Sequence, residues 1–289
     1  MTEMQPIRAP ASITNYADDE ILFHKGEEAR DIFIIEEGQV DIFDPATGRI
    51  MSSLGRGHLI GEQALFQIGV RVASARAKGN LRCQQLPLGI VRKIISSEPD
   101  LIQTGIEGLC LQLATLNHFG ATLQAEESKA MVRPSLGSLS SQQAQALLKV
   151  LVKQVDPVDS CPPEELLYIK VLASPILRTM FFSEVDWNSS KAPEQPFMIL
   201  DGELGATWGS RSIRVARGAV FGLAESILGR PQFMTSRALS AFSARVFPAT
   251  QMVTYLSKSN VGVAGICRGL ALKIVDAYAD QQEVLVNGN

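Results

Sequence analysis

The segment IGEQALFQIGVRVASARAK, residues 60–78, determines how the rest of the chain is interpreted. It opens on a Gly-Glu pair, Gly61 and Glu62, and Ala64 follows in a short stretch suited to a helical turn. Arg71 comes ten residues after Gly61 and precedes a run of small residues. Taken alone, Glu62 and Arg71 could form an ordinary surface ion pair, which contributes little. The order of the whole segment and its surroundings indicate more.

Upstream of this segment, short apolar runs alternate with turn residues. DIFIIEEG (31–38) and QVDIFD (39–44) are two such runs, and Pro45 to Gly48 provide a turn after the second. Alternation of this kind, interrupted by Gly and Pro, predicts short strands and a hairpin. Many short strands at regular spacing favour a β-sandwich or a jelly-roll-like barrel.

Downstream, the pattern changes to helical periodicity. Ile and Leu recur at helical spacing over 90–95 and again over 101–116, after Pro99, and the second helix could continue past His118. Residues 121–141 are polar and small, which is typical of a linker. Further segments follow, predicted as helices over 142–155 and 164–173, strands over 196–208, 212–222 and 236–249, and a final helical stretch over about 252–280.

The order of strands then helices therefore occurs twice, and two sequence matches support an internal repeat. FIIEEG (33–38) aligns with FMILDG (197–202), and GHLIG (57–61) aligns with GAVFG (218–222). We predict a mainly β fold with α, in which two tandem jelly-roll-like β-barrel domains are each followed by helices. The expected boundaries are 1–120 for the first domain with its long helix, 121–174 for a helical connector, and 175–289 for a degenerate second copy.

Residues 60–78 resemble the phosphate-binding cassette of cyclic-nucleotide-binding domains, the family of the catabolite activator protein and the regulatory subunit of cAMP-dependent kinase. The matching residues are the Gly-Glu pair, the small residue and leucine that follow it, and the arginine with the small residues after it: Gly61, Glu62, Ala64, Leu65, Arg71 and Ala73. DIFIIEEGQVDIF (31–43) is similar to the family's strand pair, and residues 88–116 are similar to its helices after the barrel. About a hundred residues share the resemblance.

The resemblance implies that the cassette binds a cyclic nucleotide. The implied ligand-binding residues are Gly61, Glu62, Gln63, Ala64, Arg71, Val72 and Ala73. An arginine offers a planar fork of donors to two phosphate oxygens, a helical turn presents free amides to the anion, and a carboxylate can accept a hydrogen bond from the ribose 2′-hydroxyl. Base contacts are expected near Thr115, Leu116 and Asn117.

Two further features concern the nucleotide and the second copy. Val72 stands where cGMP-selective members often carry Thr, which favours cAMP over cGMP. In the second copy Leu223 replaces the ribose acceptor, and Gln232 or Phe233 takes the place of the arginine. We therefore expect the second copy to keep the fold without cyclic-nucleotide binding, with Arg230 as a minor alternative phosphate ligand.

Composition and motifs argue against several other classes of function. The net charge is −3 and Lys and Arg form no block, so the chain lacks the basic surface typical of a nucleic-acid-binding protein. The four cysteines are scattered, which predicts neither a disulfide framework nor a metal site. No run of 18 apolar residues and no secretory signal occurs. No nucleophile, HExxH or Walker-type motif is present. These observations predict a cytoplasmic protein without catalytic activity, metal or membrane association.

Three hypotheses for function remain. The first is a cyclic-nucleotide sensor in signal transduction that relays binding to an unidentified protein partner. The second is a transcription regulator of the catabolite-activator type, although no basic helix-turn-helix follows the long helix. The third is a structural adaptor whose barrels bind no ligand. The apolar stripe also suggests a homodimer through residues 100–119.

Overall fold

The computed structural model describes residues 12–65, 71, 73–124, 142–145, 163–187, 195–208, 211–215, 217–259 and 261–287. It divides into two compact units. The first unit comprises Met1–Pro99 and Leu256–Lys273, and the second comprises Asp100–Tyr255 and Ile274–Asn289. Each unit therefore combines segments that are far apart in the sequence.

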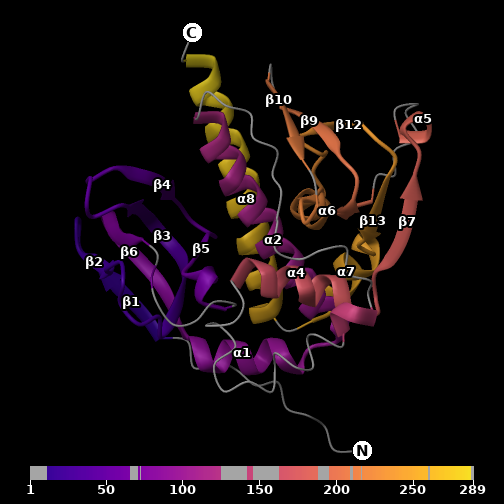
Figure 1. The fold of residues 1–289 in the computed structure, drawn as a ribbon. Coiled ribbons are helices and arrows are strands. Elements are labelled where there is room, and N and C mark those ends of the chain that lie inside the picture. The colour runs from indigo at the N-terminus through magenta and orange to yellow at the C-terminus, as the bar shows by residue number, and fades with distance from the viewer. Residues whose placement is uncertain are drawn as a thin grey trace, which may run out of the picture. The chain divides into compact units, whose positions relative to one another are not determined.

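The first unit contains an antiparallel sheet of six strands (Figure 1). Its strands are β1 (Ser12–Tyr16), β2 (Ile21–Phe23), β3 (Asp31–Phe43), β4 (Ile50–Leu54), β5 (Leu59–Ile60) and β6 (Ser74–Pro87). They pair in the order β1-β6-β3-β4, with β2 on β6 and β5 on β3. The predicted hairpin is confirmed, since β3 pairs with β4 and the Asp44 amide donates to the Arg49 carbonyl across the turn at 3.0 Å. Helix α1 (Leu88–Ser97) follows β6 directly.

Small residues after Arg71 allow β6 to lie against the core of the first unit. Ala75 and Ala77 are buried completely or nearly so, whereas Arg76 between them is partly exposed. This is the alternation of a strand with one face in the core. Phe33 and Ile35 of β3 belong to the same buried cluster. The alanines therefore leave room for large side chains on the paired strand.

Gly38 shows why the family-like turn glycine is needed. It has φ +87°, in the left-handed region, and a Cβ at this position would collide with the backbone oxygen of Asn80. The pairing of β3 with β6 shifts register just before it, between Ile35 and Glu37, and again across it, between Glu37 and Gln39. A residue without a side chain lets β3 bend at this irregularity without steric conflict.

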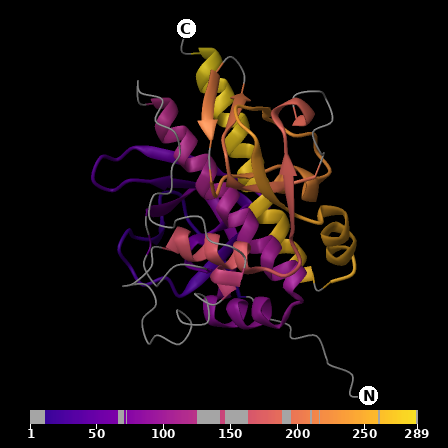
Figure 2. The same cartoon turned by 45° about the vertical axis from the view of Figure 1, so that its right-hand side comes forward.

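The second unit contains two antiparallel sheets and several helices (Figures 1 and 2). Its sheets pair in the orders β11-β8-β13-β7 and β10-β9-β12. The strands are β7 (Arg178–Phe182), β8 (Phe197–Asp201), β9 (Leu204–Trp208), β10 (Arg211–Val215), β11 (Val220–Phe221), β12 (Thr235–Ala238) and β13 (Phe242–Val246). The helices are α2 (Asp100–Gln124), α4 (Pro163–Ala173), α5 (Glu184–Asp186), α6 (Leu223–Leu228) and α7 (Ala249–Leu256).

The predicted order of strands then helices, occurring twice, is confirmed. Closed barrels are not seen, because the pairing of the described strands runs along open paths. The domain boundaries at residues 120 and 174 stay predictions. The linker expected over 121–141 lies outside the described residues from 125 onward, as does the helix expected over 142–155 beyond residue 145.

The single helical stretch expected over 252–280 is wrong in one respect. The structure has two helices there, α7 and α8 (Val261–Asn287). A serine-rich segment separates them, and the Ser259 hydroxyl donates to the Leu256 carbonyl at 3.1 Å. Serine side chains compete in this way for the backbone groups that a continuous helix would use. Helix α8 is shared between the units, and its residues up to Lys273 belong to the first.

Helix α2 packs tightly within the second unit through two glycines. A Cβ at Gly105 would collide with Met252, and a Cβ at Gly108 would lie 2.6 Å from Phe247 and 2.8 Å from Leu223. The apolar stripe of the helix is buried in a single chain, with Ile102, Ile106, Leu109 and Leu116 fully inaccessible. This burial removes the reason for expecting a homodimer through residues 100–119.

None of the helices within the described ranges combines the length and apolar composition needed to cross a bilayer.

Candidate functional site

The predicted cassette begins at a sharp turn between β5 and a short helical segment. Gly61 has φ +83°, and the 3₁₀ helix η1 (Glu62–Leu65) follows it. A Cβ on Gly61 would collide with Nη1 of Arg71. The glycine is therefore required for two reasons: only Gly adopts this φ without strain, and only Gly leaves space for the guanidinium.

Arg71 lies in the interior of the first unit, with 7% of its surface exposed. Its Nη2 donates to the Asp31 carbonyl at 2.6 Å, and its guanidinium carbon lies 4.0 Å from the centre of the Phe23 ring. The loop is tied down as well, because the Arg71 amide donates to the Glu27 carbonyl at 2.8 Å. The guanidinium is thereby fixed in position before any ligand arrives.

Two of the N–H donor groups of Arg71 have no acceptor among the described residues. In the part of the chain that the structure describes, Nε and Nη1 of Arg71 are buried and make no hydrogen bond. Burial lowers the pKa of Arg71, and the nearby carboxylates of Asp31, Glu62 and Glu27 raise it in opposition. Since arginine stays protonated in proteins, the site holds a buried cation with free donors. Such a group requires an acceptor, and an anion would satisfy it.

Glu62 supplies a buried carboxylate at the start of η1, with 2% of the residue exposed. Its Oε1 accepts a hydrogen bond from Nζ of Lys273 at 2.6 Å. Its Oε2 is buried and, among the described residues, has no hydrogen-bond donor. The carboxylate therefore has one oxygen held by a cation and one available as an acceptor.

The structure places the other predicted site residues as follows. Ala64 and Ala73 are buried at 5% and 7% exposure. Gln63 lies in η1, but its side chain is outside the described residues, as is the whole of Val72. Thr115 and Asn117 belong to α2, with side chains outside the described set, while Leu116 is fully buried. The structure thus brings Gly61, Glu62 and Arg71 together, and a ligand-binding role for them remains a prediction.

Sequence reasoning missed two basic residues that support this loop. Arg92 of α1 donates from its guanidinium to the backbone carbonyls of Ala64 and Leu65, so it holds the end of η1. Lys273 approaches Glu62 from α8, 211 residues away in the chain. Arg92 lies 28 residues after Ala64 and 27 after Leu65, and nothing in the local sequence of α1 or α8 points to these contacts.

Residues 222–233, which the sequence predicts to be a second cassette, begin with a similar turn but carry different side chains. Gly222 has φ +75° and precedes α6, and a Cβ there would lie 2.6 Å from Nε2 of Gln232. Gln232 therefore occupies the position relative to Gly222 that Arg71 occupies relative to Gly61. Leu223, in the position of Glu62, is fully buried. Of the two residues expected to replace the arginine, the geometry selects Gln232, while Phe233 stacks on Tyr278 with ring centres 5.8 Å apart.

A glutamine from α2 fills the second cassette. The Ala224 amide donates to Oε1 of Gln112 at 2.9 Å, and Nε2 of Gln112 donates to Oε2 of Glu225 at 2.8 Å. Glu225 is 2% exposed, and burial raises its pKa. The amide that begins α6 and the nearby carboxylate are therefore satisfied inside the chain.

Replacing Gln112 with alanine is expected to destabilise the protein by about 2–3 kcal/mol, because it leaves a buried carboxylate and a buried amide without partners. The free energy of unfolding in urea measures the loss. Gln251→Ala, at an exposed position of α7, is the matched control and should change it by less than about 0.5 kcal/mol. Equal effects of the two substitutions would show that Gln112 has no such role.

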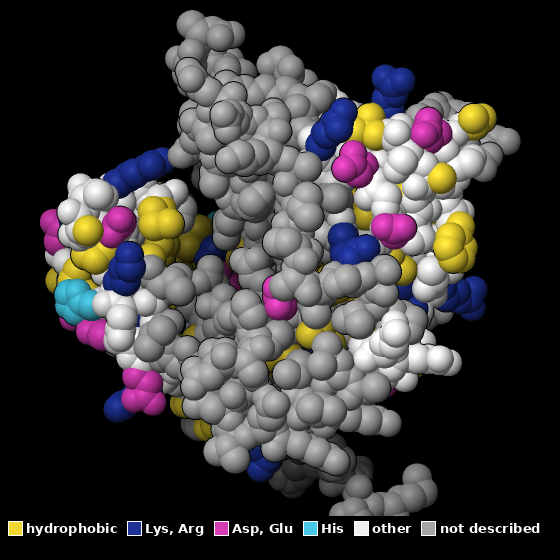
Figure 3. All heavy atoms as spheres, in the orientation of Figure 1, with side chains coloured by type: hydrophobic (Ala, Val, Ile, Leu, Met, Phe, Trp, Pro, Cys, Tyr) yellow, Lys and Arg dark blue, Asp and Glu magenta, His cyan; other side chains and the backbone are white. Residues whose placement is uncertain are grey.

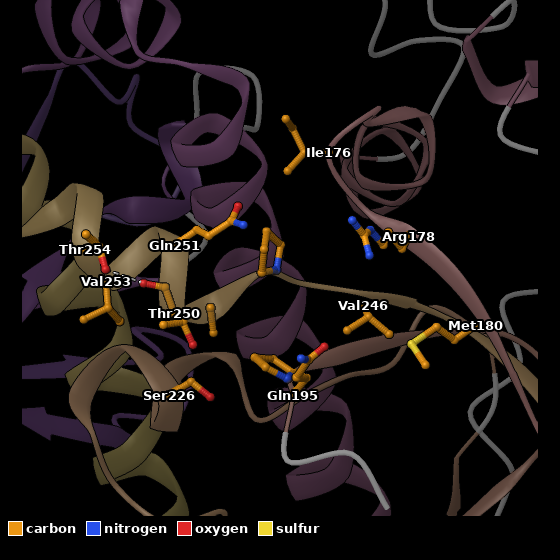
Figure 4. Close-up of a pocket in the computed structure, with 13 residues that line it drawn as sticks. Ile176, Arg178, Met180, Gln195, Ser226, Val246, Thr250, Gln251, Val253 and Thr254 are labelled. Carbon is orange, nitrogen blue, oxygen red and sulfur yellow. Dashed lines mark hydrogen bonds between the residues drawn. The ribbon is translucent and has the colours of Figure 1, made fainter.

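The second unit also contains an open cavity of about 1090 Å³ (Figure 4). Arg178 and Met180 of β7 line one side, and Thr250, Val253 and Thr254 of α7 line another. None of its lining residues is among the ligand-binding residues predicted from the sequence. Among the described residues, the lining of this cavity includes no acidic side chain.

Buried thiols and mixed surface charge characterise the rest of the described chain. Burial raises the pKa of Cys83 and Cys267 to about 12, so both thiols stay protonated at neutral pH. On the face drawn in Figure 3, Lys and Arg side chains are interspersed with Asp and Glu.

Comparison with known proteins identifies the first unit more closely. Residues 13–98 match the family model "Cyclic nucleotide-binding domain". A curated relative, the "cAMP-dependent protein kinase regulatory subunit" of Blastocladiella emersonii, is 29% identical over 91 residues, which cover 30% of this chain and 23% of that protein. The match thus spans less than a quarter of that relative.

Two solved structures are similar to parts of the chain. A cyclic nucleotide-binding-like protein from Brucella abortus is 25% identical, with 30% of this chain and 77% of that chain covered and a TM-score of 0.27. The structure described as "cAMP bound PfPKA-R (141-441)" is 13% identical, with 95% of this chain and 80% of that chain covered and a TM-score of 0.34. With TM-scores below 0.5, the assignment rests on the sequence match.

Proposed function

Because residues 13–98 belong to the cyclic nucleotide-binding domain family, we propose that this chain is a cyclic-nucleotide sensor that regulates a protein partner and catalyses no reaction. The ligand site comprises the residues of the first cassette: Gly61, Glu62, Gln63, Ala64, Arg71, Val72 and Ala73. The relative in Blastocladiella emersonii is named as a regulatory subunit, which supports regulation rather than catalysis. The protein acts in the cytoplasm.

One observation carries the proposal: a buried arginine and a buried carboxylate each have an unused hydrogen-bonding group. Nε and Nη1 of Arg71 and Oε2 of Glu62 are buried and, within the described residues, without partners. A cyclic phosphate supplies the acceptors that the arginine needs, and the ribose 2′-hydroxyl supplies the donor that the carboxylate needs. One cyclic nucleotide carries both the acceptors and the donor that these two groups need.

The second cassette takes no nucleotide in this proposal. The Gln112 side chain accepts a hydrogen bond from the Ala224 amide and donates one to Glu225. Gln232 stands where the first cassette has its arginine. The chain therefore binds one nucleotide, and cAMP is favoured over cGMP by the valine at position 72.

Titration calorimetry of the full chain with cAMP, cGMP and 5′-AMP tests the proposal. We expect cAMP to bind with a stoichiometry of one per chain, cGMP to bind more weakly, and 5′-AMP to bind at least about tenfold more weakly than cAMP, because its dianionic open phosphate does not fit a site built for a ring. Absence of binding by both cyclic nucleotides would show that the proposed function is wrong. A stoichiometry of two would show that the second cassette is functional.

Ligand binding is relayed through a change in helix arrangement that the nucleotide favours. The described surface and the net charge of −3 give no support to a DNA-binding role. Specific binding in a salt-dependent gel shift with genomic DNA would favour the transcription-regulator hypothesis instead.

A further inference from the structure

The C-terminal helix contributes a residue to the first cassette. Nζ of Lys273, on α8, lies 2.6 Å from Oε1 of Glu62, and the two side chains are 18% and 3% exposed. Both residues belong to the first unit. A contact this short between two largely buried charges is a strong, charge-assisted hydrogen bond rather than a surface ion pair.

Close packing of α8 on the first unit explains how the lysine reaches the cassette. A Cβ on Gly269 would lie 3.1 Å from Cβ of Leu59 and 3.3 Å from the Gly57 carbonyl oxygen, so the helix backbone lies against the chain that leads into β5. The Leu272 side chain lies 3.4 Å from the Cβ position of Gly57. Gly269 and Lys273 are four residues apart and share a helix face. The glycine brings the helix close, and the lysine follows one turn later, opposite Glu62.

The two oxygens of Glu62 therefore have different environments. Oε1 is held by Lys273, while Oε2 is buried and, among the described residues, has no donor. A carboxylate buried without any cation would be costly, and without the hydrogen bond on one oxygen it would be free to rotate. Lysine thus both compensates the charge and fixes which oxygen is available.

We propose that Lys273 is a positioning residue of the nucleotide site, which orients Glu62 toward the ribose 2′-hydroxyl and makes nucleotide affinity depend on docking of the C-terminal helix. This inference rests on the proposed function. By thermodynamic linkage, a nucleotide that binds more tightly when α8 is docked stabilises that docking by the same factor. The docking of helix α8 then changes when a nucleotide binds to the first cassette.

In this proposal Lys273 raises nucleotide affinity only by orienting Glu62 toward the 2′-hydroxyl. A general structural role would instead affect nucleotides with and without that hydroxyl equally. Removing the lysine should weaken cAMP, which has that hydroxyl, and leave 2′-deoxy-cAMP nearly unchanged. Calorimetry of the full chain with both nucleotides measures the difference. For Lys273→Gln we expect the Kd for cAMP to rise about tenfold, with a change of less than about twofold for 2′-deoxy-cAMP.

Two further variants complete the test. Arg268→Gln removes a positive charge at an exposed position of the same helix and should leave both affinities within about twofold. Lys273→Arg keeps the charge and a donor, and should retain cAMP affinity within about threefold. Because it preserves the ion pair, this variant gives a result even if Lys273→Gln fails to fold.

In the native chain, hydrogen exchange of the amides over 262–273 should be slower with cAMP than with 2′-deoxy-cAMP at equal saturation.

The outcomes are distinct. Unchanged cAMP affinity in Lys273→Gln, or equal losses for the two nucleotides, overturns the inference and leaves the proposed function intact. The same holds if exchange over 262–273 does not respond to cAMP. If the native chain binds neither cAMP nor cGMP, the proposed function fails and the inference fails with it.

Discussion

Substituting Arg71 with alanine is expected to weaken cAMP binding by at least about 100-fold, because hydrogen bonds to a charged group contribute about 1.5–3 kcal/mol each and two free donors are removed. The guanidinium is already held by Phe23 and the Asp31 carbonyl. Little ordering of the side chain is therefore needed on binding, and most of the interaction contributes to affinity. Titration calorimetry with cAMP measures the loss.

Two variants control for effects on folding and on charge. Arg76→Ala removes an arginine whose side chain is 34% exposed and should change the Kd by less than about threefold. Arg71→Lys keeps the charge but loses the planar fork, and its affinity should lie between those of the native protein and the alanine variant. Binding within about threefold of native in a folded Arg71→Ala protein would show that the phosphate lies elsewhere.

The free energy of unfolding should fall by up to about 3 kcal/mol between pH 4.5 and pH 7, because the buried carboxyl of Glu107 resists ionisation in the folded state. Burial raises the pKa of Glu107 from its ordinary 4.5 to about 7, and Lys170, 3.6 Å away, lowers it in partial compensation. Asp100 raises it further. The side chain is 15% exposed, so solvent screens it only weakly.

The sign of this pH dependence follows from whether the folded or the unfolded state binds the Glu107 proton more tightly. Below pH 4.5 the Glu107 carboxyl is protonated in both the folded and the unfolded state, so the free energy of unfolding is not reduced by its ionisation there. As the pH rises the unfolded chain releases the proton first, while the folded chain keeps it until about pH 7. The folded state then binds more protons, and its stability decreases with pH. Urea unfolding at a series of pH values measures this slope.

Glu107→Gln keeps the shape of the side chain and cannot ionise, so the decline between pH 4.5 and pH 7 should be smaller by about 3 kcal/mol in this variant. Glu184→Gln, at an exposed position, should leave the decline as it is in the native chain. Parallel stability curves for native protein and Glu107→Gln would contradict the assignment of the decline to Glu107.

The glycine turns at Gly61 and Gly222 have similar backbones but differ in the side chains around them. Both begin on a glycine with positive φ that accommodates a long polar side chain, Arg71 at Gly61 and Gln232 at Gly222. At the first, Nε and Nη1 of Arg71 and Oε2 of Glu62 have no partner among the described residues, whereas at the second Gln112 bonds to the Ala224 amide and to Glu225. This difference is the basis for proposing that a nucleotide binds at the first turn and not at the second.

The sequence by itself determined what depends on neighbouring residues. The resemblance of residues 60–78 to a cyclic-nucleotide cassette predicted that Gly61, Glu62 and Arg71 meet, and the motif could be recognised because its residues are close together in the sequence. The sequence also shows that no arginine lies ten residues after Gly222, where Gln232 stands. The order of strands and helices followed from periodicity, although the break between α7 and α8 did not, since serines occur both inside helices and at their ends.

Only the tertiary structure decided which helix packs on which cassette. Periodicity tells which face of a helix is apolar, but many surfaces could cover that face. Lys273 meets Glu62 and Gln112 meets Glu225 across more than a hundred residues of chain, and neither pair carries a local signal. Long-range packing, which satisfies buried charges wherever the folded chain brings partners together, selected these two contacts.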